Sequence, residues 1–242
     1  ELRNDACFIV MGSEGRNEQI IKTDQDNALV IKDGIEVEQY KFYMNEITKN
    51  LIDFGYPICE GNIMVSNPFW CKTVNEYKNE TARWIEAPGI QNYMDLAIFF
   101  DSFAVAGNKE LLINLKDDLF NKLHDKDVFM AYFAKATLAF DTPNTVTNIM
   151  TKSHIIDIKK TAVFPIVQGI RSLAWKEKIR ETTTIKRIKM LENRKVLEKD
   201  KAAELLEAFD FVNTIRLKSQ LFDIQHGKKI TNEIDTHTLG KI

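Results

Sequence analysis

The sequence predicts an α+β protein in which a small α/β domain is followed by an all-helical bundle domain. Two observations support this fold class. Short apolar runs typical of buried strands alternate with helical patterns in the first half of the chain, and almost only helical patterns follow from about residue 108. We place the two domains at residues 1–125 and 126–242. No apolar run approaches the roughly 18 residues of a membrane-spanning helix, so no membrane association is expected.

Strands are expected where short apolar runs end at turn-forming residues. Residues 6–11 end at Gly12, residues 27–31 are closed by Lys-Asp-Gly, and the apolar segment 94–100, which ends in Asp101, is a third predicted strand. Helical spacing of apolar residues predicts helices at 36–54, 73–86, 109–124, 127–140, 154–180, 182–196 and 199–226.

The overall charge is nearly balanced. The chain has 33 Lys and Arg residues against 35 Asp and Glu residues, a net charge of −2, so we do not expect a nucleic-acid partner. The three cysteines, Cys7, Cys59 and Cys71, have no metal-ligand spacing and suggest neither a disulfide framework nor a zinc site. A reducing cytoplasm fits this cysteine content best.

Two aspartates, Asp24 and Asp26, lie one residue apart where the second predicted strand begins, and we expect both to be part of this strand. In an extended strand, side chains at i and i+2 point to the same face, where two unpaired carboxylates would repel each other. A divalent cation between them removes this repulsion, and oxygen ligands favour Mg²⁺ or Mn²⁺. If the strand before Asp101 lies beside the second strand, Asp101 supplies a third ligand. Three such acids would hold two metals about 4 Å apart, as in phosphoryl or nucleotidyl transfer.

A Gly-Ser pair, Gly12 and Ser13, stands where the first strand turns into a helix, with Gly15 close behind. Such a turn exposes backbone N–H groups to a phosphate, and Arg16 would add a bidentate phosphate contact. Taken separately, these features also fit a simple turn, a helix cap and strand-end caps. Their occurrence together and in this order favours the metal and phosphate site.

Two other loop classes are weaker matches to this stretch. The letters GSEG have the GxxG form of an RNA-binding KH loop, but Glu14 and Glu18 oppose a phosphate backbone and the aspartate pair would go unexplained. The P-loop pattern requires Gly-Lys-Ser/Thr after the second glycine, which is absent here.

The strings GSEGRNEQIIKTDQDNALV, GYPICEGNIMVSN and FFDSF carry a specific resemblance. A Gly-Ser turn, ten residues, an Asp-x-Asp pair and a later acid resemble the signature of the DNA polymerase beta-like nucleotidyltransferases. Within this superfamily the chain is similar to a narrower group, the bacterial nucleotidyltransferase domains that accompany CBS or cyclic-nucleotide-binding modules and are related to the PII-protein uridylyltransferase. The strings IIDIKKTAVFPIVQGIRSLAW and NTIRLKSQ extend the resemblance into the helical domain.

The resemblance implies a role for each candidate residue. Gly12 and Ser13 would bind the nucleoside triphosphate, and the three aspartates, Asp24, Asp26 and Asp101, would bind Mg²⁺ and be catalytic. On the helical domain, Lys159 or Arg171 would face the nucleotide; the alternative is a surface charge or an interhelix ion pair. These two residues, twelve apart on one predicted helix, are separated by about three turns and 120°.

The implied activity is a Mg²⁺-dependent transfer of a nucleoside monophosphate from an NTP to an acceptor hydroxyl, with release of pyrophosphate, in signalling or regulation. The resemblance does not specify the acceptor. Protein side chains, small metabolites and nucleic acid ends all serve as acceptors on this fold. Because the chain starts without Met and soon enters a strand pattern, we expect regulatory domains upstream. The alternative is an NTP-sensing regulatory module without transfer activity. Phe103, where the family commonly has Arg, slightly favours that alternative.

Overall fold

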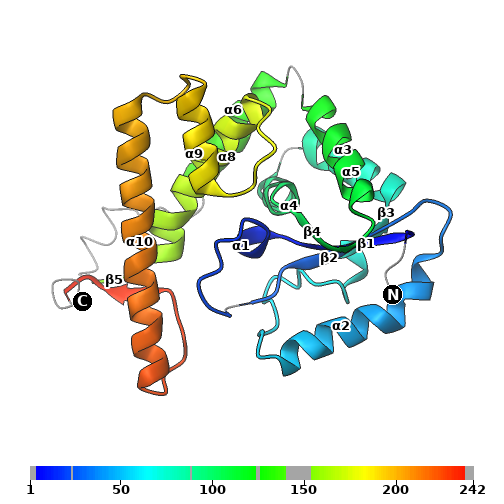
Figure 1. Ribbon diagram of the computed structural model, residues 1–242, viewed down its shortest axis with the longest axis horizontal. Coiled ribbons are helices and arrows are strands. Elements are labelled where there is room, and N and C mark those ends of the chain that lie inside the picture. The colour runs from blue at the N-terminus through cyan, green and yellow to red at the C-terminus, as the bar shows by residue number, and fades with distance from the viewer. Residues whose placement is uncertain (1–3, 23, 88, 124–125, 140–153, 238–242) are drawn as a thin grey trace. The chain divides into compact units, whose positions relative to one another are not determined.

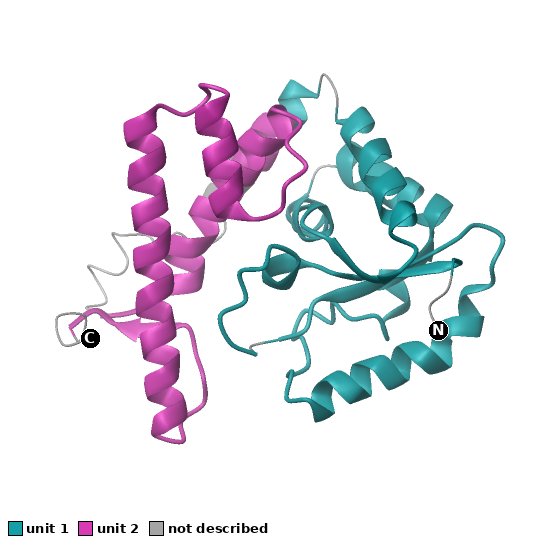
Figure 2. Ribbon diagram, in the orientation of Figure 1, with its two compact units in different colours: residues 1–129 teal, residues 130–242 magenta. Residues whose placement is uncertain are grey.

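The computed structural model describes residues 4–22, 24–87, 89–123, 126–139 and 154–237. The chain forms two compact units, residues 1–129 and residues 130–242, shown in different colours in Figure 2. The first unit contains a small mixed sheet with helices, and the second is mainly helical. The predicted α+β class is therefore confirmed.

Four strands form the sheet of the first unit in the order β3-β2-β1-β4. Their bounds are β1 (Ala6–Val10), β2 (Asn27–Ile31), β3 (Cys71–Thr73) and β4 (Phe103–Gly107). β1 is antiparallel to both β2 and β4, whereas β2 is parallel to β3. At one end of the sheet Val10 lies opposite Asn27 on one side and Phe103 on the other. The segments that carry the candidate site residues leave or enter the sheet at this end.

Helices cover both faces of this sheet, with α2 on one face and α3, α4 and α5 on the other (Figure 1). β2 is accordingly buried along its whole length. The face beneath α2 is filled by a cluster of six buried residues: Ala6, Leu29, Ile31, Met44, Val65 and Cys71. The helical segments of this unit are α1 (Gly12–Gly15), η1 (Val37–Tyr40), α2 (Lys41–Asp53), η2 (Pro68–Trp70), α3 (Val74–Glu86), α4 (Ile90–Phe100) and α5 (Lys109–Lys122).

The prediction of a strand at 94–100 is wrong, because these residues are the end of helix α4. Tyr93, Leu96, Ala97 and Phe100 are buried at the helical spacing of three and four residues. A short apolar run fits a buried helix and a buried strand equally well, and here the helix is enclosed on nearly all sides. The actual strand, β4, begins after Asp101 and was not predicted. The strand lies at an edge of the sheet, where its large side chains, Phe103 and Val105, are exposed.

Other predicted helices agree with the structure. The helix predicted at 73–86 is α3, and it begins with a capping box in which the Thr73 hydroxyl accepts from Glu76 N and the Glu76 carboxylate accepts from Thr73 N. Helix α6 (Asp127–Ala139) matches the prediction at 127–140, whose last residue lies outside the described part of the chain.

The second unit contains η3 (Lys159–Val163), α8 (Phe164–Lys176), α9 (Thr184–Asn193) and α10 (Lys199–Gln225). Its core joins α8, α9 and α10 through six buried residues: Ile170, Ala174, Ile179, Ile188, Leu191 and Ala202. The helix predicted at 154–180 is shorter, because its first residues form the strand β5 (Ile155–Asp157), which pairs antiparallel with β6 (Glu233–Asp235). The helical unit thus carries a two-stranded ribbon in addition to its helices.

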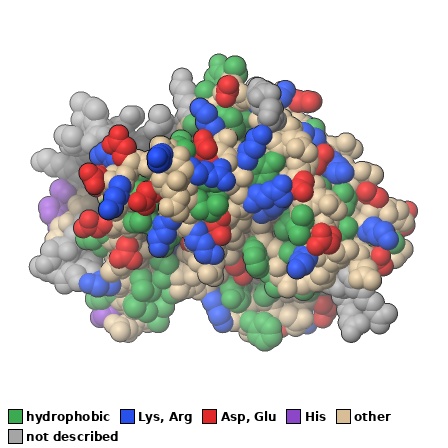
Figure 3. All heavy atoms as spheres, turned by 45° about the horizontal axis from the view of Figure 1, so that its top comes forward, with side chains coloured by type: hydrophobic (Ala, Val, Ile, Leu, Met, Phe, Trp, Pro, Cys, Tyr) green, Lys and Arg blue, Asp and Glu red, His purple; other side chains and the backbone are tan. Residues whose placement is uncertain are grey.

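The surface carries charges of both signs. Figure 3 shows acidic and basic side chains interspersed on one face of the molecule. Within the described residues, no helix has the length and apolar character needed to cross a bilayer.

Candidate functional site

The Gly-Ser turn (Gly12–Gly15, helix α1) is a single helical turn that follows β1 directly, as predicted. It ends in a Schellman motif, in which Glu18 N donates to Ser13 O at 2.8 Å and Asn17 N donates to Glu14 O at 2.9 Å. Asn17 takes the left-handed conformation that this motif requires, with φ 57°. The motif turns the chain back sharply, so that Glu18 returns toward the helix end.

Asp24 and Asp26 lie in the segment that leads into β2, not within the strand as predicted. The β1–β2 ladder ends at the Val10–Asn27 pair because β1 turns into α1 at Gly12. One further backbone hydrogen bond, from Met11 N to Asp26 O at 2.8 Å, fixes Asp26 beside the start of the Gly-Ser turn. The turn and the aspartate pair are therefore brought together by the sheet.

The carboxylate of Asp26 lies directly against Gly12. A Cβ atom placed on Gly12 would be 2.4 Å from Asp26 Oδ2, and Gly12 also has a φ of +55°, so both contact and conformation require glycine here. On the other oxygen, the Cys59 thiol donates to Asp26 Oδ1 at 3.1 Å. Burial, and secondarily Asp26, raises the pKa of Cys59 to about 12. The thiol therefore stays protonated near neutral pH and acts as a donor, not as a thiolate ligand.

Asn27 holds the loop that carries Cys59 against the start of β2. The Asn27 side-chain oxygen accepts from Val65 N at 2.8 Å, and Asn27 N donates to Ile63 O at 3.0 Å. Its side-chain nitrogen donates to Gln25 at 3.3 Å. Neither Asn27 nor Cys59 was predicted to belong to the site, because only the fold brings the loop at 55–67 next to the aspartates.

Glu14 is an acidic residue of this region that was not predicted to belong to the site. Burial raises its pKa to about 7, with further increases from the charges of Asp26 and Asp24. The turn that was expected to receive phosphate therefore presents a carboxyl group toward the negative potential of the aspartate pair. Its position two residues after Gly12 is the feature of the sequence that could have indicated that Glu14 lies near the site.

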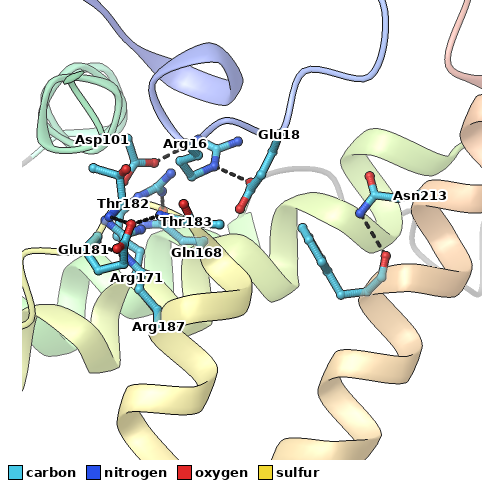
Figure 4. Close-up of polar contacts among 11 residues, drawn as sticks. Arg16, Glu18, Asp101, Gln168, Arg171, Glu181, Thr182, Thr183, Arg187 and Asn213 are labelled. Carbon is cyan, nitrogen blue, oxygen red and sulfur yellow. Dashed lines mark hydrogen bonds and ion pairs between the residues drawn. The ribbon is translucent and has the colours of Figure 1, made fainter. Parts of the chain in front are cut away.

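Asp101 is not placed as predicted. It follows helix α4, and the strand after it, β4, lies beside β1 and not beside β2. Asp101 is fully buried, and its Oδ2 accepts a hydrogen bond from the Arg16 guanidinium at 2.8 Å. Arg16 Nε in turn donates to Glu18 Oε2 at 2.7 Å (Figure 4). Arg16, expected to bind phosphate, is thus engaged by two carboxylates.

The residues present fit a divalent cation only as a partial shell. Within the described part of the chain, no three His, Cys, Asp or Glu side chains are grouped so as to hold a metal ion. Mg²⁺, however, commonly takes only one or two protein carboxylates and completes its coordination with water and substrate phosphates. Asp24 and Asp26 meet that requirement, since the donors are oxygens, the adjacent thiol is protonated, and the charges of both aspartates add to the effect of burial on the pKa of Glu14.

The two basic residues expected from the helical domain lie in consecutive helical segments. Lys159 opens η3, and Arg171 lies in α8. Lys159 is half-buried. Arg171 is buried and its guanidinium donates to the Gln168 side chain (Figure 4).

A mixed sheet that brings a Gly-Ser turn next to an Asp-x-Asp pair is the arrangement of a nucleotidyltransferase domain. Residues 1–91 match the family model described as "Putative nucleotidyltransferase DUF294", and residues 127–242 match the model described as "Putative nucleotidyltransferase substrate binding domain". The chain belongs to this nucleotidyltransferase family. The first match contains Gly12, Ser13, Asp24 and Asp26 but ends before Asp101. None of the curated proteins matches the sequence.

Gly15 provides a test of the packing behind the turn. A Cβ on Gly15 would lie 2.2 Å from Asp101 O and 2.8 Å from Val10 O, both backbone atoms. We expect Gly15→Ala to lower the free energy of unfolding by roughly 1–3 kcal/mol, because backbone must move. Gly169→Ala is the control: Gly169 lies in helix α8 with no atom near the added methyl, and alanine should stabilise the helix by up to about 1 kcal/mol. Urea unfolding of both variants measures the difference, and equal stabilities would contradict the close approach.

The raised pKa of Glu14 predicts a pH dependence of stability. Between its ordinary value of 4.5 and about 7, the folded protein holds this proton more tightly than the unfolded chain does. Stability from this group is therefore fully present below pH 4.5 and is lost as the pH rises through 7.

Thermal melts in chelator between pH 4.5 and 8 should show a shallower decline for Glu14→Gln than for the parent. Glu36→Gln, at an exposed residue before η1, is the matched control and should keep the parent slope. A parent-like slope in Glu14→Gln would show that folding does not raise the pKa of Glu14.

Proposed function

We propose that this chain is a Mg²⁺- or Mn²⁺-dependent nucleotidyltransferase that moves a nucleoside monophosphate from an NTP to an acceptor hydroxyl. The acceptor oxygen forms a bond to the α-phosphorus, the bond between that phosphorus and the β-phosphate oxygen breaks, and pyrophosphate leaves. The hydroxyl proton passes to water or a nearby base. The observation that carries the proposal is the contact between Asp26 and Gly12, which joins the aspartate pair to the Gly-Ser turn.

Each residue of the site has a role in this proposal. Asp24 and Asp26 hold the divalent ion, and the backbone of Gly12 and Ser13 binds the triphosphate. A bound ion supplies polarisation of the phosphoryl oxygens and neutralises charge that develops in the transition state. Cys59 and Gly12 fix the Asp26 carboxylate from two sides before substrate arrives, so little reorganisation is needed during the reaction.

The nucleotide and the acceptor are defined only by class. We infer that Lys159 or Arg171 contributes positive charge to the triphosphate, in keeping with the match of this segment to a substrate-binding domain. The acceptor carries a hydroxyl group and is a protein or a small molecule. A role in signalling follows from the likeness to domains that accompany regulatory modules.

A second candidate is a module that binds NTP and transfers nothing. Two observations favour it: Asp101 is engaged by Arg16, and Phe103, 58% exposed, stands where the family commonly has Arg. Both candidates require metal-dependent nucleotide binding, so the transfer step separates them.

Calorimetry tests nucleotide binding. ATP or UTP should bind more tightly with Mg²⁺ or Mn²⁺ than in chelator, and Asp26→Asn should weaken this metal-dependent binding by about 10-fold or more. Asp53→Asn, at an exposed residue that ends α2, is the matched control and should bind like the parent. Equal affinity with and without divalent ions would contradict the metal site.

Transfer is tested with labelled NTPs and cell lysate, followed by detection of labelled product and pyrophosphate. In Asp26→Asn the transfer rate should fall by about 10²-fold or more, because the metal ion that stabilises the transition-state charge loses a carboxylate ligand. An unchanged transfer rate in Asp26→Asn would show that Asp26 is not a catalytic residue. Tight metal-dependent binding by a parent that labels no acceptor would favour the sensor.

The helical unit is tested by Lys159→Met and Arg171→Met, which keep the side-chain stem and remove the charge. One of them should lower NTP affinity by roughly 10-fold, the effect of losing one charged phosphate contact. Lys160→Met is the control, since Lys160 is exposed and pairs with Asp157 at 3.8 Å. Parent-like affinity in both variants, with parent-like melting, would mean that this unit supplies neither contact.

A further inference from the structure

Arg16 joins two carboxylates that come from different parts of the chain. Its Nε contacts Glu18, two residues away, and one terminal nitrogen contacts Asp101, 85 residues away. The three side chains are only 11%, 10% and 0% exposed in the order Arg16, Glu18, Asp101. Burial alone would lower the pKa of Arg16, but Asp101 and then Glu18 raise it above its ordinary value. The guanidinium is therefore a permanent charge in a buried bridge.

The bridge is built by local backbone structure. The Schellman motif at Asn17 reverses the direction of the chain, so that Glu18 reaches the guanidinium of Arg16 at the end of α1. Asp101 stands before β4, whose first residue, Phe103, pairs with Val10 of β1. The same corner packs its Asp101 carbonyl against Gly15. The bridge and this close packing both attach α1 to the corner between α4 and β4.

The Gly-Ser turn is consequently held at both ends. At its start, Asp26 fits against Gly12 and binds Met11 N through its carbonyl. At its end, Arg16 ties it to Asp101. A one-turn helix has little stability of its own, so such contacts determine where its backbone N–H groups point.

A bidentate contact between Arg16 and the triphosphate would need a different arrangement. Such a contact uses two neighbouring guanidinium nitrogens, and because Nε and Nη1 are directed at buried carboxylates at 2.7 and 2.8 Å, one of these carboxylates would have to be released. Removing one partner from a buried ion pair is strongly unfavourable. The existing geometry thus opposes phosphate binding by Arg16.

We infer that Arg16 is a positioning residue of the nucleotide site, which fixes the Gly-Ser turn through its paired contacts with Asp101 and Glu18 and does not itself bind the triphosphate. The inference rests on the proposed function and assigns Asp101 to the bridge in place of the metal site. The bridge needs arginine, because two differently directed N–H groups are used and a lysine ammonium lacks this planar fork.

A double-mutant cycle of Arg16→Met, Asp101→Asn and the combined variant tests the inference through Mg²⁺–ATP affinity. If Arg16 positions the turn through Asp101, each single change weakens binding by a similar factor, about 10- to 100-fold, and the double variant is no worse than either single one. Arg16→Lys behaves like Arg16→Met, since charge without the fork does not rebuild the bridge. Lys41→Met, which removes an exposed pair with Glu38, is the control and leaves affinity unchanged.

A direct phosphate contact gives the opposite pattern and overturns the inference. Arg16→Met then weakens binding alone, Arg16→Lys restores much of it, and Asp101→Asn leaves affinity at the parent value. If Asp101→Asn does not fold, Glu18→Gln replaces it in the cycle, because this change keeps the side-chain shape and the Asp101 contact.

Hydrogen exchange separates this inference from the proposed function. In the nucleotide-free protein, exchange at the amides of Gly15, Arg16 and Glu18 should be faster in Arg16→Met and in Asp101→Asn than in the parent and Lys41→Met. A parent that binds no NTP, with this faster exchange, refutes the proposed function and leaves the anchoring role supported. Unchanged exchange in both variants refutes the anchoring role, whether or not NTP binds.

Discussion

The approach of the Asp26 carboxylate to Gly12 is the constraint on which the rest of the site depends. It requires a residue without a side chain at the end of β1, in a left-handed conformation. It also requires that β2 begin where β1 ends, which the antiparallel register provides. The loop bound to Asn27 completes the arrangement by bringing the Cys59 thiol to the other oxygen of Asp26. Sheet register, one glycine and one loop together fix a single carboxylate.

The two glycines of the Gly-Ser turn serve different purposes. Gly12 makes room for the side chain of Asp26, whereas Gly15 makes room for the backbone of Asp101 and Val10. The turn lies between these contacts, so its position is set by the sheet on one side and by the α4–β4 corner on the other. Arg16 adds a charged contact to the second side. A short helix can therefore hold a defined orientation although its own hydrogen bonds are few.

The parts predicted correctly from the sequence are those with strong local signals. The first two strands end at Gly12 and at a Lys-Asp-Gly turn, and α3 has a Thr-x-x-Glu cap. The segment 94–100 was misassigned because an enclosed helix has no polar face. The position of Asp101 could not be predicted without the order of the strands, since β4 joins the sheet next to β1. Glu14, Cys59 and Arg16 are defined by contacts across the fold, which spacing along the chain does not encode.

Charge balance explains why a nucleotide would need a metal ion to enter this site. Burial raises the pKa of Glu14 to about 7, and the negative charges of Asp26 and Asp24 add to this increase. Arg16 already pairs with the carboxylates of Glu18 and Asp101, so its single charge is not available to offset an incoming triphosphate. A bare triphosphate would add like charge to the aspartate pair, whereas a triphosphate that carries a divalent ion brings the cation those carboxylates need. On the proposed function, metal dependence would follow from these charges in an enzyme and in a sensor alike, and only the fate of the α-phosphate would distinguish the two.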